Sequence, residues 1–158
     1  VTVKRSGRTI YEDNALNDAV VTKGAVARVI QMSISVDDQE AMEFDGDGIV
    51  LSTPTGTTAY SMSAGGPIVE PGAENIIVTP ICAHSMSIRS LVLSRERTVA
   101  TRIGRIGKRS AFLSVDGGKA FRLSAEDEVI VTASNRSIQL IRLKDTSFYG
   151  VLNHKFQG

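Results

Sequence analysis

The sequence predicts a mainly β, multi-stranded domain of the sandwich type, with one short helix near its middle and another at its C-terminus. Apolar or alternating runs recur about every ten residues, as in antiparallel β domains. Clusters of Gly, Asp, Asn and Ser separate these runs and predict turns. Only residues 59–64 and 144–156 have helix-compatible spacing. With 158 residues, the chain is long enough for one domain with its own core.

These patterns predict the elements in chain order. Residues 9–14 are polar and predict a loop, and residues 45–48 read Asp-Gly-Asp-Gly, which predicts a tight turn. Residues 1–145 are expected to form the β-rich domain, and residues 146–158 a helical tail with an apolar face. Strands are predicted at residues 1–5, in the run that ends at 21, and at 26–36, 41–44, 49–51, 76–81, 91–93, 98–103, 111–115, 120–123, 128–133 and 137–143.

Composition and charge narrow the class of protein. The chain is 42% hydrophobic and 22% charged with a net charge of +1, so no strong field attracts nucleic acid or membranes. A group of Arg and Lys at residues 95–109 is interpreted mainly as a solvated face. Cys82 is the only cysteine, which favours a reducing, cytoplasmic setting. The chain begins in a strand without an initiating Met, so we expect it to be a piece of a longer protein.

The most informative stretch covers residues 47–71 and reads DGIVLSTPTGTTAYSMSAGGPIVEP. Its apolar run at residues 49–51 predicts a buried strand, and seven Ser and Thr residues follow within residues 52–63, here called the hydroxyl segment. Buried hydroxyls need hydrogen-bond partners, which a polar ligand could supply. Composition alone favours a surface loop, whereas the preceding strand and following helix favour a site for phosphate or ribose.

The same stretch closely resembles the signature of the ATP-dependent NAD kinases, which typically reads DG, a few apolar residues and then TPTGSTAYSLSAGGPI. The resemblance covers about twenty consecutive positions and is far more specific than a lone glycine motif. It implies a β-rich C-terminal domain that binds NAD and follows an α/β domain, on which the helical tail would pack. It also implies NAD and ATP as substrates, NADP as product, Mg²⁺ bound with ATP, and a homo-oligomer.

The resemblance also implies which residues bind NAD. Asn17 and Asp18 fall on a family pair that contacts NAD, with Asp18 where many relatives have Glu. Asp47 falls on an aspartate associated with the nicotinamide end, partly across a subunit interface. By themselves these three residues would be interpreted as turn formers. The positions that would line the adenosine side are Thr55, Thr58, Ala59, Tyr60 and Ser63.

Asp45 and Asp116 lie in two further Asp-Gly pairs. Asp116, followed by Gly117, resembles another family position, and a simple hairpin turn explains it equally well. The family's catalytic aspartate lies in a GGDGT motif of the first domain. The string at residues 44–49 lacks that pattern, so Asp45 and Asp47 receive no catalytic role and the sequence offers no catalytic residue. Its two His and one Cys form no metal-ligand motif.

The sequence therefore predicts the C-terminal domain of an NAD kinase, which transfers the γ-phosphate of ATP to the 2′-hydroxyl of the adenosine ribose of NAD. Alone, this domain is expected to be inactive. A lipid or sphingoid kinase of the same superfamily is one alternative, disfavoured because its substrate calls for an apolar pocket. The other alternative is a free-standing module that senses NAD or NADP, which the missing GGDGT motif permits.

Overall fold

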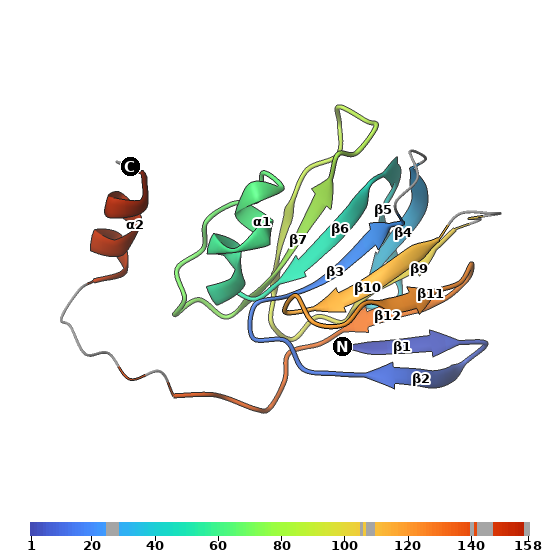
Figure 1. Ribbon diagram of the computed structural model, residues 1–158, viewed down its shortest axis with the longest axis horizontal. Helices are drawn as coiled ribbons and strands as arrows, with labels where there is room; N and C mark the ends of the chain where they lie inside the picture. The colour runs from blue at the N-terminus through green and yellow to red at the C-terminus, as the bar shows by residue number, and fades with distance from the viewer. Residues whose placement is uncertain (25–28, 105, 107–109, 140, 142–146, 157–158) are drawn as a thin grey trace.

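The computed structural model describes residues 1–24, 29–104, 106, 110–139, 141 and 147–156, and it confirms the predicted mainly β sandwich (Figure 1). All strand pairs are antiparallel and form two six-stranded sheets. Sheet A contains, in spatial order, β2 (Arg8–Glu12), β1 (Thr2–Arg5), β12 (Glu128–Val131), β9 (Val99–Ile103), β4 (Ile30–Val36) and β5 (Gln39–Gly46). Sheet B contains β11 (Phe121–Leu123), β10 (Ala111–Val115), β3 (Asp18–Lys23), β6 (Gly48–Ser52), β7 (Asn75–Ile81) and β8 (Leu91–Ser94).

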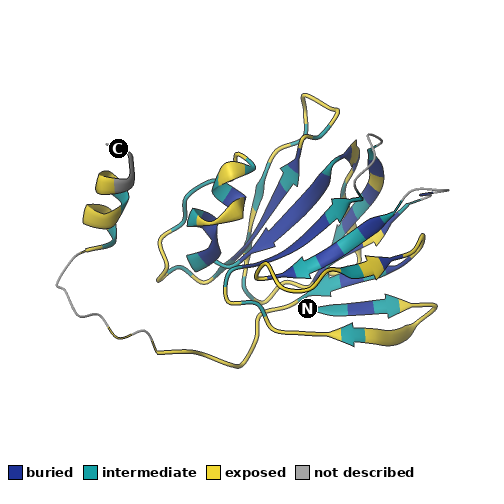
Figure 2. Ribbon diagram, in the orientation of Figure 1, coloured by how far each residue is buried: buried dark blue, intermediate teal, exposed yellow. Residues whose placement is uncertain are grey.

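The core lies between the two sheets and follows the two-residue period of the strands. In β4, Ile30, Met32 and Ile34 are fully buried, and they belong to the same cluster as Ile49 and Leu51 of β6. Sheet B is buried on its outer face as well, where Val20, Val50 and Ile81 form a second cluster. As a result all five residues of β6 are buried, which confirms the buried strand predicted from its apolar run (Figure 2).

Two short helical elements follow β6, where the sequence predicts a helix. They are the 3₁₀-helix η1 (Thr55–Thr58) and the single turn α1 (Tyr60–Ser63). They lie over the outer face of sheet B (Figure 1), with Ala64 packed on the second cluster. A helix of one turn has a small dipole, so the expected contribution of a helix N-terminus to anion binding is weak here.

The predicted C-terminal helix is present as α2 (Phe148–Phe156) and stands apart from both sheets in Figure 1. Tyr149 is 63% exposed and Val151 is 47% exposed. No helix among the described residues is long and apolar enough to cross a membrane.

Several local predictions are wrong in the type of element, and others are correct in type and differ in bounds. The polar stretch at residues 9–14 is not a loop: β2 pairs with β1, and its polar side chains suit an exposed edge strand. The short strand predicted at 41–44 is the eight-residue β5. The strand predicted at 137–143 is absent in its described residues, 137–139 and 141, which have no regular structure. For the strand predicted at 26–36, only residues 29–36 lie within the described part, and β4 occupies 30–36.

The Asp-Gly-Asp-Gly string is not a hairpin turn either. β5 ends at Gly46 in sheet A and β6 begins at Gly48 in sheet B, so Asp47 alone carries the chain between the sheets. A Cβ atom on Gly48 would lie 2.2 Å from the backbone oxygen of Val21. Close approach of two backbones, rather than a positive φ, therefore explains this glycine.

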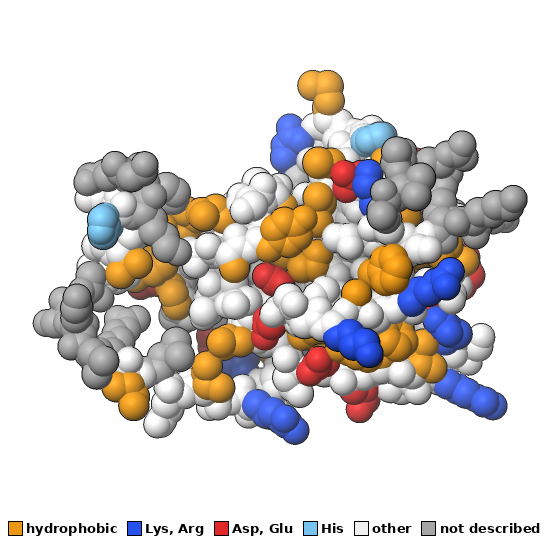
Figure 3. Space-filling model, in the orientation of Figure 1, with side chains coloured by type: hydrophobic (Ala, Val, Ile, Leu, Met, Phe, Trp, Pro, Cys, Tyr) orange, Lys and Arg blue, Asp and Glu red, His pale blue; other side chains and the backbone are white. Residues whose placement is uncertain are grey.

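The basic residues of the 95–109 group that are described here form ion pairs on the surface. Arg95 pairs with Glu74, Arg97 with Asp37, and Arg102 with Glu128. On the face shown in Figure 3, Lys and Arg side chains are spread out and interspersed with acidic ones. For these three residues the interpretation as a solvated face is correct, whereas Arg105, Lys108 and Arg109 lie outside the described residues.

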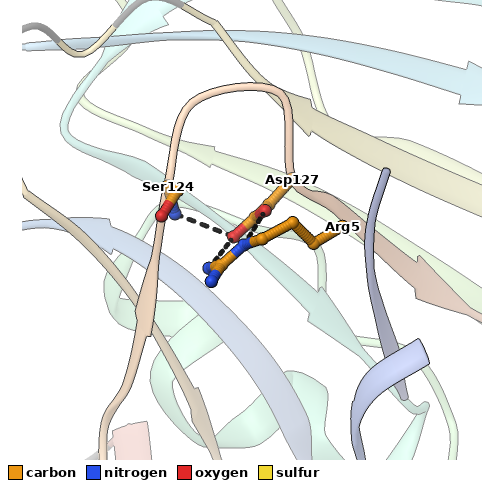
Figure 4. Close-up of polar contacts among 3 residues, drawn as sticks. All are labelled: Arg5, Ser124 and Asp127. Atoms are coloured by element: carbon orange, nitrogen blue, oxygen red, sulfur yellow. Dashed lines mark hydrogen bonds and ion pairs between the residues drawn. The ribbon is translucent and has the colours of Figure 1, made fainter. Parts of the chain in front are cut away.

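One ion pair in sheet A, between the end of β1 and the turn before β12, is partly buried (Figure 4). The Arg5 guanidinium donates to both carboxylate oxygens of Asp127, at 2.8 and 2.7 Å, and the Ser124 N–H donates to Asp127 Oδ2 at 2.8 Å. The Asp127 side chain is 0% exposed and that of Arg5 is 44% exposed. Burial raises the pKa of Asp127, but the bonds from Arg5 and Ser124 outweigh burial and leave that pKa below its ordinary value.

We predict that Arg5→Met lowers the free energy of unfolding by about 2 kcal/mol, because it leaves the buried Asp127 carboxylate without its cation. Urea unfolding measures this effect. Since the pKa of Asp127 is lowered by folding, the contribution of the pair is present above the ordinary pKa of 3.8 and is lost as the pH falls through the folded-state pKa.

Arg97→Met is the matched control, because its ion pair with Asp37 is exposed on both sides. It should cost clearly less stability than Arg5→Met. Equal losses of unfolding free energy for Arg5→Met and Arg97→Met would show that burial of Asp127 does not make the Arg5 pair more stabilising than an exposed pair.

Candidate functional site

A cleft of about 610 Å³ opens at the end of the sandwich where β3 and β7 begin and where β6 and β12 end. This volume is in the range of small-molecule sites. Its lining includes Leu16, Thr53, Thr55 and Asp116. The cleft thus brings together the start of β3, the hydroxyl segment and the β10–β11 turn, three parts of the chain that are far apart in sequence.

The predicted site residues occupy two adjoining zones. Thr55 and Asp116 line the cleft. Asp18 instead lies on the outer face of sheet B, because it is two residues from Val20, which packs on that face. Four other predicted residues of the hydroxyl segment lie over that same face: Thr58 in η1, Tyr60 and Ser63 in α1, and Ala59 between the two. Asn17 joins the two zones, since it stands between Leu16 of the cleft and Asp18.

The backbone of residues 16–18 is fixed on its N–H side by one carboxylate. Asp116 Oδ2 accepts the N–H of Leu16 at 2.6 Å, and Oδ1 accepts those of Asn17 at 2.7 Å and Asp18 at 3.0 Å. In return, the N–H of Asp116 donates to the oxygen of Asp18 at 2.9 Å. Sequence reasoning left Asp116 undecided, because a contact across about 100 residues leaves no local pattern.

The same backbone is fixed on its carbonyl side by the hydroxyl segment. The Thr53 hydroxyl donates to the oxygen of Leu16 at 2.7 Å, and the Thr53 N–H donates to that of Asn17 at 2.9 Å. Thr53 Oγ1 also accepts the N–H of Gly56 at 3.0 Å. Gly56 is packed so closely that a Cβ atom there would lie 2.0 Å from the oxygen of Asn17.

The hydroxyls of the segment divide into structural and outward-facing groups, apart from Ser52, whose buried hydroxyl has no hydrogen-bond partner among the described residues. Thr53, Thr57 and Ser61, four residues apart, find partners inside the protein: Thr57 bonds Pro54 and Val69, and Ser61 bonds Thr79. The expectation that a ligand supplies all of these partners is therefore wrong for this group. The residues that resemblance assigns to NAD are half-buried or exposed, namely Thr55, Thr58, Ala59, Tyr60 and Ser63.

Asp18 is a buried carboxylate, with 5% of the residue exposed. Among the described residues, no group donates a hydrogen bond to its side chain. Burial raises the pKa of Asp18, and the charge of Asp116 raises it further. Folding raises the pKa of Asp18 above the ordinary value of 3.8. The fold therefore loses stability as the pH rises from 3.8 through the folded-state pKa and Asp18 ionises. A buried, unpaired carboxylate that costs stability is typical of a functional position.

Asp47 does not join these residues within one chain. It precedes β6, whereas the hydroxyl segment begins at the other end of that strand, about 17 Å away along an extended chain. Its carboxylate forms an ion pair with Lys23 Nζ at 2.6 Å. In the described part of the chain, no group of three or more His, Cys, Asp or Glu is placed to hold a metal ion, so these residues do not fit a Mg²⁺ site of their own.

The fold is that of a two-sheet antiparallel β-sandwich domain with a cleft at one end. Residues 16–143 match the family model of the ATP-NAD kinase C-terminal domain, and the chain belongs to this family. It is 39% identical over 155 residues to the NAD kinase of Carboxydothermus hydrogenoformans, covering 98% of this chain and 55% of that protein. The chain thus spans about half the length of the curated relatives it matches.

Solved structures agree with this assignment. The crystal structure of yeast NADH kinase complexed with NADH matches with a TM-score of 0.76 and 35% identity, over 83% of this chain and 38% of that one. The NAD kinase from Archaeoglobus fulgidus in complex with ATP matches with a TM-score of 0.67 and 27% identity, over 84% of this chain and 50% of that one.

We predict that Gly56→Ala lowers the free energy of unfolding by roughly 2–3 kcal/mol, because the new Cβ collides with the Asn17 carbonyl group and separates residues 16–18 from the hydroxyl segment. Gly72→Ala is the control, since a Cβ there has nothing within 4 Å and the φ of Gly72 is ordinary. If urea unfolding gives the same midpoint for both variants, the close packing of Gly56 on Asn17 does not support the site.

Proposed function

We propose that this chain is the NAD-binding domain of an ATP-dependent NAD kinase. The intact enzyme would transfer the γ-phosphate of ATP to the 2′-hydroxyl of the adenosine ribose of NAD and release ADP and NADP. The observation that carries the proposal is the meeting of Asn17 and Asp18 with the outward-facing part of the hydroxyl segment at one end of the sandwich. Family membership and relatives named NAD kinase support it.

The chemistry of the site suits the adenosine half of a dinucleotide. The amide of Asn17 both donates and accepts, and the carboxylate of Asp18 accepts, so together they can hold ribose hydroxyls or the edge of adenine. Among the described residues, neither side chain has a hydrogen-bond partner, which leaves both available to a ligand. Tyr60 is 45% exposed and can stack on a base or donate its hydroxyl, while Thr58 and Ser63 add further hydroxyls.

The remaining parts of the enzyme would come from outside these residues. We assign the catalytic aspartate and the phosphate clamps to the upstream domain of the intact protein, and Mg²⁺ to the phosphates of ATP. Asp47, which lies at the other end of β6, would serve the site of a neighbouring subunit in a cytoplasmic homo-oligomer. The exposed Tyr149 and Val151 of α2 would pack on the upstream domain.

We predict that the 158-residue chain binds NAD saturably in a calorimetric titration, and that the double substitution Asn17→Ala, Asp18→Ala weakens binding at least about tenfold. The matched control is Gln39→Ala, Glu40→Ala, an adjacent amide and carboxylate that are both exposed and lie at the start of β5, in the other sheet. The same preparation, supplied with ATP, Mg²⁺ and NAD, should make no NADP.

Three results would count against the proposal. If the folded chain binds no NAD, this domain does not form the NAD pocket by itself. If both double variants weaken binding equally, Asn17 and Asp18 are not part of that pocket. Magnesium-dependent formation of NADP by the purified chain would show that the catalytic groups lie here.

A further inference from the structure

We propose that Asp116 is a positioning residue, whose carboxylate binds the backbone of residues 16–18 and thereby fixes Asn17 beside the cleft and Asp18 on the adjoining outer face of sheet B. The identity of the ligand rests on the proposed function, whereas the contact itself rests on the geometry of described residues. Asp116 lies between 98 and 100 residues beyond its partners in the chain, in the turn that joins β10 to β11. The β10–β11 turn thus supplies a residue that orients the site.

The three N–H groups that meet Asp116 belong to consecutive residues, at 2.6, 2.7 and 3.0 Å from its two carboxylate oxygens. Hydrogen bonds to an ionised acceptor are shorter and roughly twice as strong as neutral ones. No other described group accepts a hydrogen bond from these N–H groups. The carboxylate therefore sets the conformation of this segment from one side.

Thr53 sets it from the other side, through the carbonyl groups of Leu16 and Asn17. With both sides of the backbone bound, the side chains of Asn17 and Asp18 have no hydrogen-bond partner in the described part of the chain. Asn17 is half-buried, and among the described residues nothing bonds to its amide. Preorganisation of this kind reduces the ordering cost of binding a ligand.

Asp116 is more than a turn former. The N–H of Gly118 donates to the oxygen of Val115 at 2.8 Å, so the backbone closes the turn without the Asp116 side chain. Asp116 has a φ of 47°, a conformation that Asn also adopts readily. The substitution Asp116→Asn therefore keeps the turn and changes only the carboxylate. If the amide oxygen stays on Asn17 and Asp18, its NH₂ group faces the N–H of Leu16, donor against donor.

The test compares the ¹³C,¹⁵N-labelled wild-type chain with Asp116→Asn. In the wild type, scalar couplings through the hydrogen bonds should join the amide nitrogens of Leu16 and Asn17 to the Asp116 carboxyl carbon, a reading that needs no variant. In Asp116→Asn, the amide protons of residues 16–18 should move upfield and exchange at least about tenfold faster. The dissociation constant for NAD should rise about tenfold, with the other amide signals unchanged.

The control is Glu126→Gln, an exposed carboxylate that also has a positive φ, 64°, in the β11–β12 turn at the opposite end of the sandwich. It should change neither the three amides nor NAD affinity. If the wild type shows no coupling to the Asp116 carboxyl carbon, or if the amide signals of residues 16–18 do not shift in Asp116→Asn, the proposed contact is wrong. Moved amides with unchanged NAD affinity overturn the positioning role. If the wild type binds no NAD, the proposed function fails, and the couplings and amide signals still decide whether Asp116 fixes the segment.

Discussion

The site depends on the double attachment of residues 16–18, whose N–H groups bond to the Asp116 carboxylate and whose carbonyl groups bond to Thr53. Every backbone group used in these bonds is unavailable to a ligand, while the side chains of Asn17 and Asp18 remain available. The attachment also joins the β10–β11 turn to the segment after β6, since both meet at the start of β3. A rigid sandwich end with a few unpaired polar side chains is a suitable frame for a polar ligand.

The hydroxyl segment is built by the same rule. Its inward positions, Thr53, Thr57 and Ser61, bond to the protein and hold η1 and α1 on sheet B. Among the outward positions, the Thr58 hydroxyl donates to the oxygen of Thr55 at a long 3.4 Å, and the other hydroxyls have no partner among the described residues. β6 is buried on both faces, so packing holds the end of this strand, where the hydroxyl segment begins, in a fixed position. Placing Asp18 at this position lowers the stability of the fold. Its burial beside Asp116 raises its pKa, so its ionised form is unfavourable in the folded chain.

Sequence patterns predicted the sandwich, most strands, and the helices after β6 and at the C-terminus, because apolar period and turn residues are local signals. They failed where a non-local partner decides the structure. Polar β2 is a strand only because β1 pairs with it, and residues 45–48 cross between sheets because the packing of Gly48 on Val21 allows it. Resemblance supplied candidate residues that no local pattern could supply. The contacts of Asp116 needed coordinates, since its partners are about 100 residues away.

The most direct test is a crystal structure of this chain with NAD. We expect the adenosine ribose within hydrogen-bonding distance of Asn17 and Asp18, the adenine beside Tyr60, and the Asp116 and Thr53 bonds to residues 16–18 unchanged. NAD bound at the opposite end of β6, around Lys23 and Asp47 of the same chain, would contradict this account, and so would NAD bound at the cleft with residues 16–18 released from Asp116.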